Sequence, residues 1–146
     1  MSQTYCVKAD IEAFWTAAAV LASVDDDSTG TLSATEEGYI TRAIERAAGR
    51  MNVYLEERYR LAELANNAWC RDTNAALAAY LLSIRRGSAA PAPFLLLHDS
   101  LMADLLEIAA GRLKVPDARE SLDNTAGITN FALDLSQGEA RLTQRE

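Results

Sequence analysis

The chain has 146 residues, of which 49% are hydrophobic and 24% charged, a balance that favours one globular domain and excludes wholesale disorder. Its net charge of −7 excludes a non-specific nucleic-acid binder, because such a protein needs a basic surface to displace counterions from phosphates. Two cysteines cannot build a disulfide scaffold, and one histidine cannot build a three-histidine metal site.

Alanine is abundant and there are only 3 prolines, so summed propensity predicts an all-α protein. We expect a bundle of about four helices with a long central helix, followed by an extended C-terminal tail. The first helix is predicted over residues 9–22, with one apolar face formed by Phe14, Ala17, Ala18 and Leu21. It ends at an acidic turn that begins at Asp25.

The second helix is predicted over residues 34–59 and is the longest. Ser33 and Glu36 have the spacing of a capping box, in which each side chain bonds the other residue's backbone amide. Apolar side chains then recur at steps of three and four residues at Ile40, Ile44, Ala47, Met51, Tyr54 and Leu55. The opposite face is charged and carries Arg42, Glu45, Arg46, Arg50 and Glu57. This pattern predicts a helix with one packed and one solvated face.

Two further helices are predicted over residues 67–86 and from about 93 to 110. Arg85 and Arg86 followed by Gly87 end the first of them, and Gly111 ends the second. The predicted core combines apolar positions of three helices, namely Ile44, Met51, Leu55, Leu77, Tyr80, Leu81, Leu101 and Leu105.

The last thirty or so residues have no helical stripe, so we divide the chain into a helical domain (1–116) and a tail (117–146). Phe131, Leu133 and Leu135 alternate with polar or small residues, which is typical of a strand. Because one strand is not stable alone, the tail is expected to dock onto a partner through these three side chains.

Residues 25–36 match the twelve-residue calcium loop of an EF-hand. Oxygen ligands fall at the expected positions, which are Asp25, Asp27, Thr29, Thr31 (through its carbonyl), Ser33 and Glu36. Gly30 stands where the loop must turn sharply. However, Thr29 replaces the more usual acidic group, and there is no second loop to pair with. A charged turn in which Ser33 and Glu36 only cap a helix is therefore the alternative to a calcium site.

No constellation in the sequence points to catalysis. His98 and Asp99 are adjacent, and neighbouring residues of a helix point in different directions. Cys6 and Cys70 are most simply buried apolar residues. We therefore expect a protein that is not an enzyme and requires no cofactor, with calcium as an optional ligand. No apolar run is long enough to span a membrane, and the first residues lack a signal-peptide pattern.

Several ordered pieces of the chain resemble the small head-tail connector (adaptor) proteins of tailed phages, and in particular the Mu-like prophage connectors. The pieces are Tyr5-Cys6, Ala9-Asp10-Ile11, the acidic turn, the helix with Ala43-Ile44 and Met51 to Tyr59, and the exit from Ile108 to Pro116. The resemblance covers about residues 5–116.

This resemblance implies a non-enzymatic ring of roughly twelve copies under the portal protein, in the neck of the virion. The ring would carry the stopper or tail-completion protein, and DNA would pass through its channel without specific binding. An acidic protein suits this role, because its charge repels the DNA phosphates. The tail would add as a strand to a neighbouring copy or to the portal. The second hypothesis is a calcium-responsive helical binding module built around residues 25–36.

Overall fold

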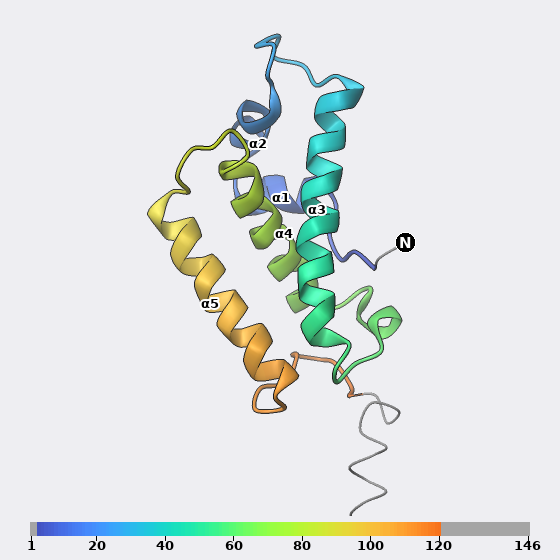
Figure 1. Cartoon of the computed structure of the whole chain (residues 1–146). Helices are drawn as coiled ribbons and strands as arrows, with labels where there is room; N and C mark the ends of the chain where they lie inside the picture. The colour runs from blue at the N-terminus through green and yellow to red at the C-terminus, as the bar shows by residue number, and fades with distance from the viewer. Residues whose placement is uncertain (1–2, 121–146) are drawn as a thin grey trace, which may run out of the picture.

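The computed structural model describes residues 3–120 (Figure 1). Its elements are α1 (Lys8–Phe14), α2 (Ala17–Val24), α3 (Ala34–Leu55), the 3₁₀ helix η1 (Leu61–Leu64), α4 (Ala68–Ser83) and α5 (Ala92–Ala109). Within residues 3–120 there is no strand, so the all-α prediction is confirmed. The predicted tail side chains Phe131, Leu133 and Leu135 lie outside the described residues.

The predicted first helix is wrong, because the chain breaks it into α1 and α2 at Trp15 and Thr16. Thr16 has an extended backbone, and its side chain accepts the Ala19 N–H at 3.0 Å as the N-cap of α2. The break turns α2 relative to the predicted face, so Phe14, Ala17 and Ala18 are exposed. The side chains that α1 and α2 bury are Ile11, Val20 and Val24.

Helix α3 begins where the capping box predicted and ends at Leu55 rather than at residue 59. After Leu55 the chain turns, with the Arg58 and Tyr59 amides both donating to the Leu55 carbonyl at 3.1 and 2.9 Å. In this turn Tyr59 is buried, and its hydroxyl accepts the Val115 N–H at 3.0 Å. Tertiary burial of one aromatic side chain therefore coincides with the end of the helix.

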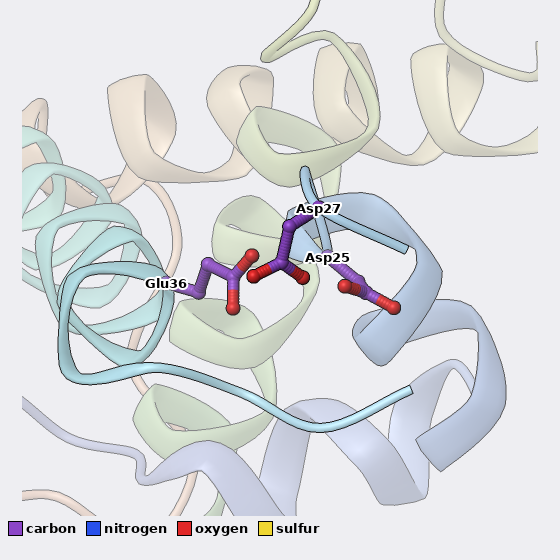
Figure 2. Close-up of side chains that lie close together, drawn as sticks. All are labelled: Asp25, Asp27 and Glu36. Carbon is purple, nitrogen blue, oxygen red and sulfur yellow. The ribbon is translucent and has the colours of Figure 1, made fainter. Parts of the chain in front are cut away.

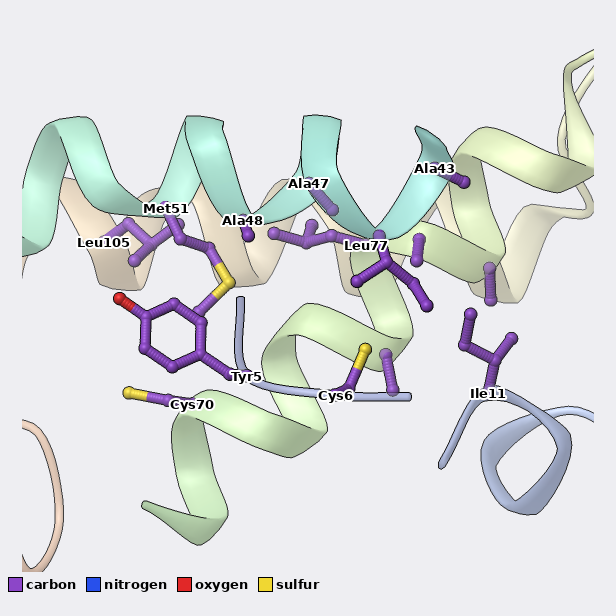
Figure 3. Close-up of a cluster of buried hydrophobic side chains, with 14 of the residues drawn as sticks. Tyr5, Cys6, Ile11, Ala43, Ala47, Ala48, Met51, Cys70, Leu77 and Leu105 are labelled. Atoms are coloured by element: carbon purple, nitrogen blue, oxygen red, sulfur yellow. The ribbon is translucent and has the colours of Figure 1, made fainter. Parts of the chain in front are cut away.

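The longest helix is α3, but α4 is the element that packs against all four other α-helices. Its buried side chains are almost all small and lie all around the helix, at Cys70, Thr73, Asn74, Ala75, Ala76, Leu77, Ala78, Ala79 and Leu82. Small side chains allow neighbouring backbones to approach closely, so α4 can be surrounded. Figure 3 shows the core that forms between α3, α4 and the N-terminal segment.

Five of the eight predicted core residues are buried, namely Ile44, Met51, Leu55, Leu77 and Leu105. Tyr80 and Leu81 of α4 and Leu101 of α5 are only half-buried. Helix α5 diverges from α3 toward its own N-terminal end (Figure 1), and Tyr80 and Leu81 line a cleft between α3, α4 and α5.

Two buried asparagines hold the N-terminal segment against α3 and α4. The Asn74 carboxamide accepts the Tyr5 N–H at 2.9 Å and donates to the Ile44 carbonyl at 3.2 Å. Asn52 donates to the Gln3 carbonyl at 2.9 Å and accepts the Tyr5 hydroxyl proton. Since buried polar groups are costly unless bonded, these contacts fix the segment in one position.

The other end of the described chain is anchored in the same way. Asn67 caps α4 by accepting the Cys70 N–H at 3.0 Å, and it donates to the Pro116 carbonyl at 2.7 Å. With the Tyr59–Val115 bond, this ties the chain after α5 to the end of the bundle.

Replacing Asn74 with alanine is expected to destabilise the protein by about 1–3 kcal/mol, because the Tyr5 N–H loses its buried acceptor. Urea denaturation of the full chain measures this. The matched control is Asn66→Ala, since Asn66 is exposed and should change stability by no more than about 0.5 kcal/mol. Equal stabilities of the two variants would contradict the assigned role.

Candidate functional site

The loop between α2 and α3 is organised by the carboxylate of Asp25. It accepts the Thr29 N–H at 3.1 Å through one oxygen and the Gly30 N–H at 2.9 Å through the other. Ser28 and Gly30 have φ angles of 58° and 77°, in the left-handed region that reverses the chain. The sharp turn predicted at Gly30 is therefore present.

Glu36 closes the loop from the first turn of α3. Its carboxylate accepts the Ser33 N–H at 2.8 Å and the Asp26 N–H at 2.9 Å, while Ser33 Oγ accepts the Glu36 N–H at 3.2 Å. The capping box is thus confirmed, and Glu36 is only 4% exposed. Its bond to Asp26 reaches beyond the cap and fastens the start of the loop to α3.

Three of the predicted calcium ligands come together in this loop. One carboxylate oxygen from each of Asp25, Asp27 and Glu36 lies within 4.8 Å of the others (Figure 2). The Thr29 hydroxyl instead donates to the Thr31 carbonyl at 2.9 Å, so these two predicted ligands bond to each other. Three carboxylates can hold a hard cation such as Ca²⁺, but the cation would compete with the backbone amides that Asp25 and Glu36 already bind.

The backbone amides bound by Asp25 and Glu36 lower the pKa values of these two carboxyl groups. The Gly30 N–H lowers the pKa of Asp25, and the Ser33 N–H lowers the pKa of Glu36. The negative charge of Asp25 acts in the opposite direction on Glu36, but its effect is smaller than that of the amides. Both groups are therefore ionised at neutral pH, as a cation ligand must be.

Two arginines at the end of α4 fix the same loop from the other side. Arg86 donates to Asp26 through Nε at 3.0 Å and Nη2 at 2.9 Å, and Arg85 bonds the same oxygen. They also donate to the last carbonyls of α2, Arg85 to Ser23 at 3.2 Å and Arg86 to Ala22 at 2.9 Å. The sequence indicated these arginines only as a helix end, because Asp26 lies some sixty residues away.

A cleft of about 480 Å³ lies between α3, α4 and α5. Arg46 and Arg50 of α3 and His98 of α5 form its polar rim. Its floor consists of Leu77, Tyr80 and Leu81 of α4 and of Ile84 at the C-cap of α4. We call this feature the α3–α5 groove. It contains Tyr80 and Leu81, two of the half-buried residues that the sequence had assigned to the core. Its floor is apolar and its rim is basic.

His98, Cys6 and Cys70, which the sequence analysis considered for catalysis, make packing contacts in the structure. The His98 ring stacks on Tyr80 at a centroid distance of 4.1 Å, and its Nδ1 lies 3.1 Å from Asp99. Cys6 and Cys70 are both free and buried, and burial raises the pKa of each thiol to about 12. Such thiols are protonated and unreactive at neutral pH, as expected for buried apolar residues.

Within residues 3–120, every helix is too short or too polar to cross a bilayer.

Comparison with known proteins identifies one family. The model of the family described as "Bacteriophage Mu, Gp36" matches residues 5–131, which is most of the chain. No curated protein matches the sequence.

If the three-carboxylate cluster binds calcium, millimolar Ca²⁺ should raise the Tm of the wild type, because it binds only the folded loop. Glu36→Gln should abolish that rise, since it removes a charged ligand. Glu36 also caps α3, so the readout is the difference in Tm with and without Ca²⁺. Glu37→Gln is the control, because Glu37 pairs with Lys8 outside the cluster. Titration calorimetry of the wild type that shows no heat would rule out the site.

The lowered pKa of the Asp26 carboxylate predicts that the folded protein loses stability in acid. The hydrogen bonds of this carboxylate to Arg85 and Arg86 lower its folded pKa below the usual 3.8. The stability that it contributes is therefore complete above that value and lost as the pH falls through the folded pKa. Asp26→Asn should lower the Tm at neutral pH, and its difference from wild type should shrink in acid.

A series of Tm measurements from neutral pH down to about pH 2 tests this prediction. Asp72→Asn serves as the control, because the 3.8 Å pair of Asp72 with Arg71 is solvent-exposed and contributes little. A difference between wild type and Asp26→Asn that stays constant with pH would contradict the assignment.

Proposed function

The chain belongs to the bacteriophage Mu Gp36 family, and on that premise we propose that it is a structural head-tail connector (adaptor) protein. In this proposal, copies of the chain form a ring of roughly twelve subunits under the portal protein, in the neck of the virion. The ring joins the capsid to the stopper or tail-completion protein, and DNA passes through its channel.

The family match is the observation that carries this proposal. It covers every helix of residues 3–120 and continues into the predicted tail, as far as residue 131. The match therefore concerns the packed helical bundle and not one isolated helix. We propose accordingly that the chain acts by assembly rather than by catalysis.

The charge of the chain supports the proposed channel. At a net charge of −7, a ring of copies presents a strongly acidic body to the DNA. Like charges across the channel weaken contacts with phosphates, so a genome can slide without binding.

The outer side of α5 supports the proposed assembly contacts. Only Leu105 and Ile108 of this helix are buried. Leu95, Leu96 and Leu106 remain 44%, 71% and 56% exposed. Large exposed apolar side chains on one element are typical of protein interfaces. Helix α5 is therefore the described element that we assign to contacts with a neighbouring copy or the portal.

The second candidate function is a calcium-responsive helical binding module. The approach of Asp25, Asp27 and Glu36 within 4.8 Å favours it. A monomer whose fold depends on calcium would support this module, whereas a ring that binds the portal would support the connector.

The mass of the assembly tests the connector proposal. Native mass spectrometry of the full chain, alone and with the portal protein of the same phage, should show a ring that associates with the portal. A monomer at all concentrations that does not bind the portal would refute the proposal.

Removing residues 121–146 separates the tail from the helical domain. The Tyr59–Val115 and Asn67–Pro116 bonds lie before the cut, so the far-ultraviolet circular dichroism per residue should still show a folded helical bundle. Attachment to portal-bearing capsids should weaken, because Phe131, Leu133 and Leu135 are lost. Normal assembly by the truncated chain would contradict the docking role of the tail.

A further inference from the structure

The proposed tail needs a receptor, and the described part of the chain contains no strand edge to which it could add. An apolar segment can instead bind in a groove between helices. We propose that residues 131–135 of one copy bind in the α3–α5 groove of the neighbouring copy. This inference rests on the proposed ring and names the contact that links its subunits.

The apolar floor of the groove is partly exposed to solvent. Tyr80 and Leu81 of α4 and Ile84 at its C-cap are half-buried, although α4 packs against all the other α-helices. On α5, Leu95 and Leu106 lie within about a quarter turn of His98 by helical spacing, and they are 44% and 56% exposed. A ligand with several apolar side chains would therefore cover surface that the single chain leaves in water.

The rim of the groove is positively charged and available. Arg46 and Arg50 are both exposed, and neither forms an ion pair with any described residue. An isolated pair of guanidinium groups beside an apolar floor selects a ligand that is apolar and carries a carboxylate.

Residues 131–135 have that chemistry, with the sequence Phe-Ala-Leu-Asp-Leu. In an extended conformation Phe131, Leu133 and Leu135 lie on one side, and Asp134 lies on the other. The three apolar side chains would occupy the floor, while Asp134 would face the arginines of the rim. The apolar pattern of residues 131–135 thus matches the floor of the groove, and the charge of Asp134 matches its rim.

The chain is long enough to make this contact. Asn67 holds Pro116 through a hydrogen bond to its carbonyl, and the structure describes the chain as far as residue 120. The eleven residues from there to Phe131 extend up to about 36 Å. This exceeds the length of α3, about 33 Å for its 22 residues, so the segment can cross to an adjacent copy.

Disulfide trapping between two full-length variants tests the proposal. One carries Ala132→Cys in the tail, and the other carries Val53→Cys, an exposed position one turn beyond Arg50 on α3. Cys6 and Cys70 are buried and do not interfere. Under mild oxidation the mixture should give a covalent dimer of the two variants. Thr41→Cys, exposed on another side of α3, is the matched control and should give at least tenfold less dimer.

Charge reversal tests the pairing itself. The trapped dimer should be lost when Asp134→Lys is added to the tail variant, and also when Arg46→Glu and Arg50→Glu are added to the groove variant. Combining the reversed tail with the reversed groove should restore it, which a merely structural effect of either change would not do.

Two results would overturn the inference. One concerns a third variant that carries both Ala132→Cys and Val53→Cys in one chain. If this variant forms the disulfide within the chain while the mixture gives no covalent dimer, the tail binds its own groove. The other is a ring that native mass spectrometry detects in the same samples although no cross-link forms. In that case the connector proposal stands and the groove assignment fails, whereas a chain that forms no ring and does not bind the portal refutes the connector proposal itself.

Discussion

The side chain of Asn74 connects three parts of the molecule that are distant in sequence. From the fully buried centre of α4 it bonds the backbone of Tyr5 on one side and the backbone of Ile44 on the other. Each of its polar groups has a partner, so this amide costs little in place, but it fits only one register of the N-terminal segment against α3 and α4. The alanines around it let these backbones come close enough for both bonds.

The same principle operates at the two ends of the bundle. At one end Asp26 accepts hydrogen bonds from Arg85 and Arg86, which follow α4, and its amide donates to Glu36 of α3. The acidic loop is therefore held by α3 and by the end of α4. At the other end Tyr59 and Asn67 hold the chain that follows α5. Polar anchors thus fix the connections, and apolar packing fixes the helices between them. The acidic loop thus joins α2, α3 and the end of α4 through hydrogen bonds, and any cation that it binds must fit this existing network.

Buried side chains are distributed unevenly among the helices. Helices α3 and α4 hold most of the core, whereas α5 buries two side chains and exposes several large apolar ones. A helix of this composition gains little more from its own chain and much from a partner. This asymmetry supports an assembly role for the proposed phage connector, in which α5 and the α3–α5 groove meet other subunits. In the proposed ring, the groove serves the predicted tail as a helical receptor in place of a strand edge.

The all-α class, the start of α3 and the loop at Gly30 were predictable from the sequence, because each depends on local signals: summed propensity, the Ser33–Glu36 spacing and a turn glycine. The approach of Asp25 and Glu36 was predictable for the same reason, since both belong to one short loop. The break at Thr16, the early end of α3 before Tyr59 and the open side of α4 at Tyr80 were not. Neither was the pairing of Asp26 with Arg85 and Arg86, some sixty residues away. These features depend on which distant side chains compete for the core and on how far α5 diverges, and only the packed tertiary structure decides that.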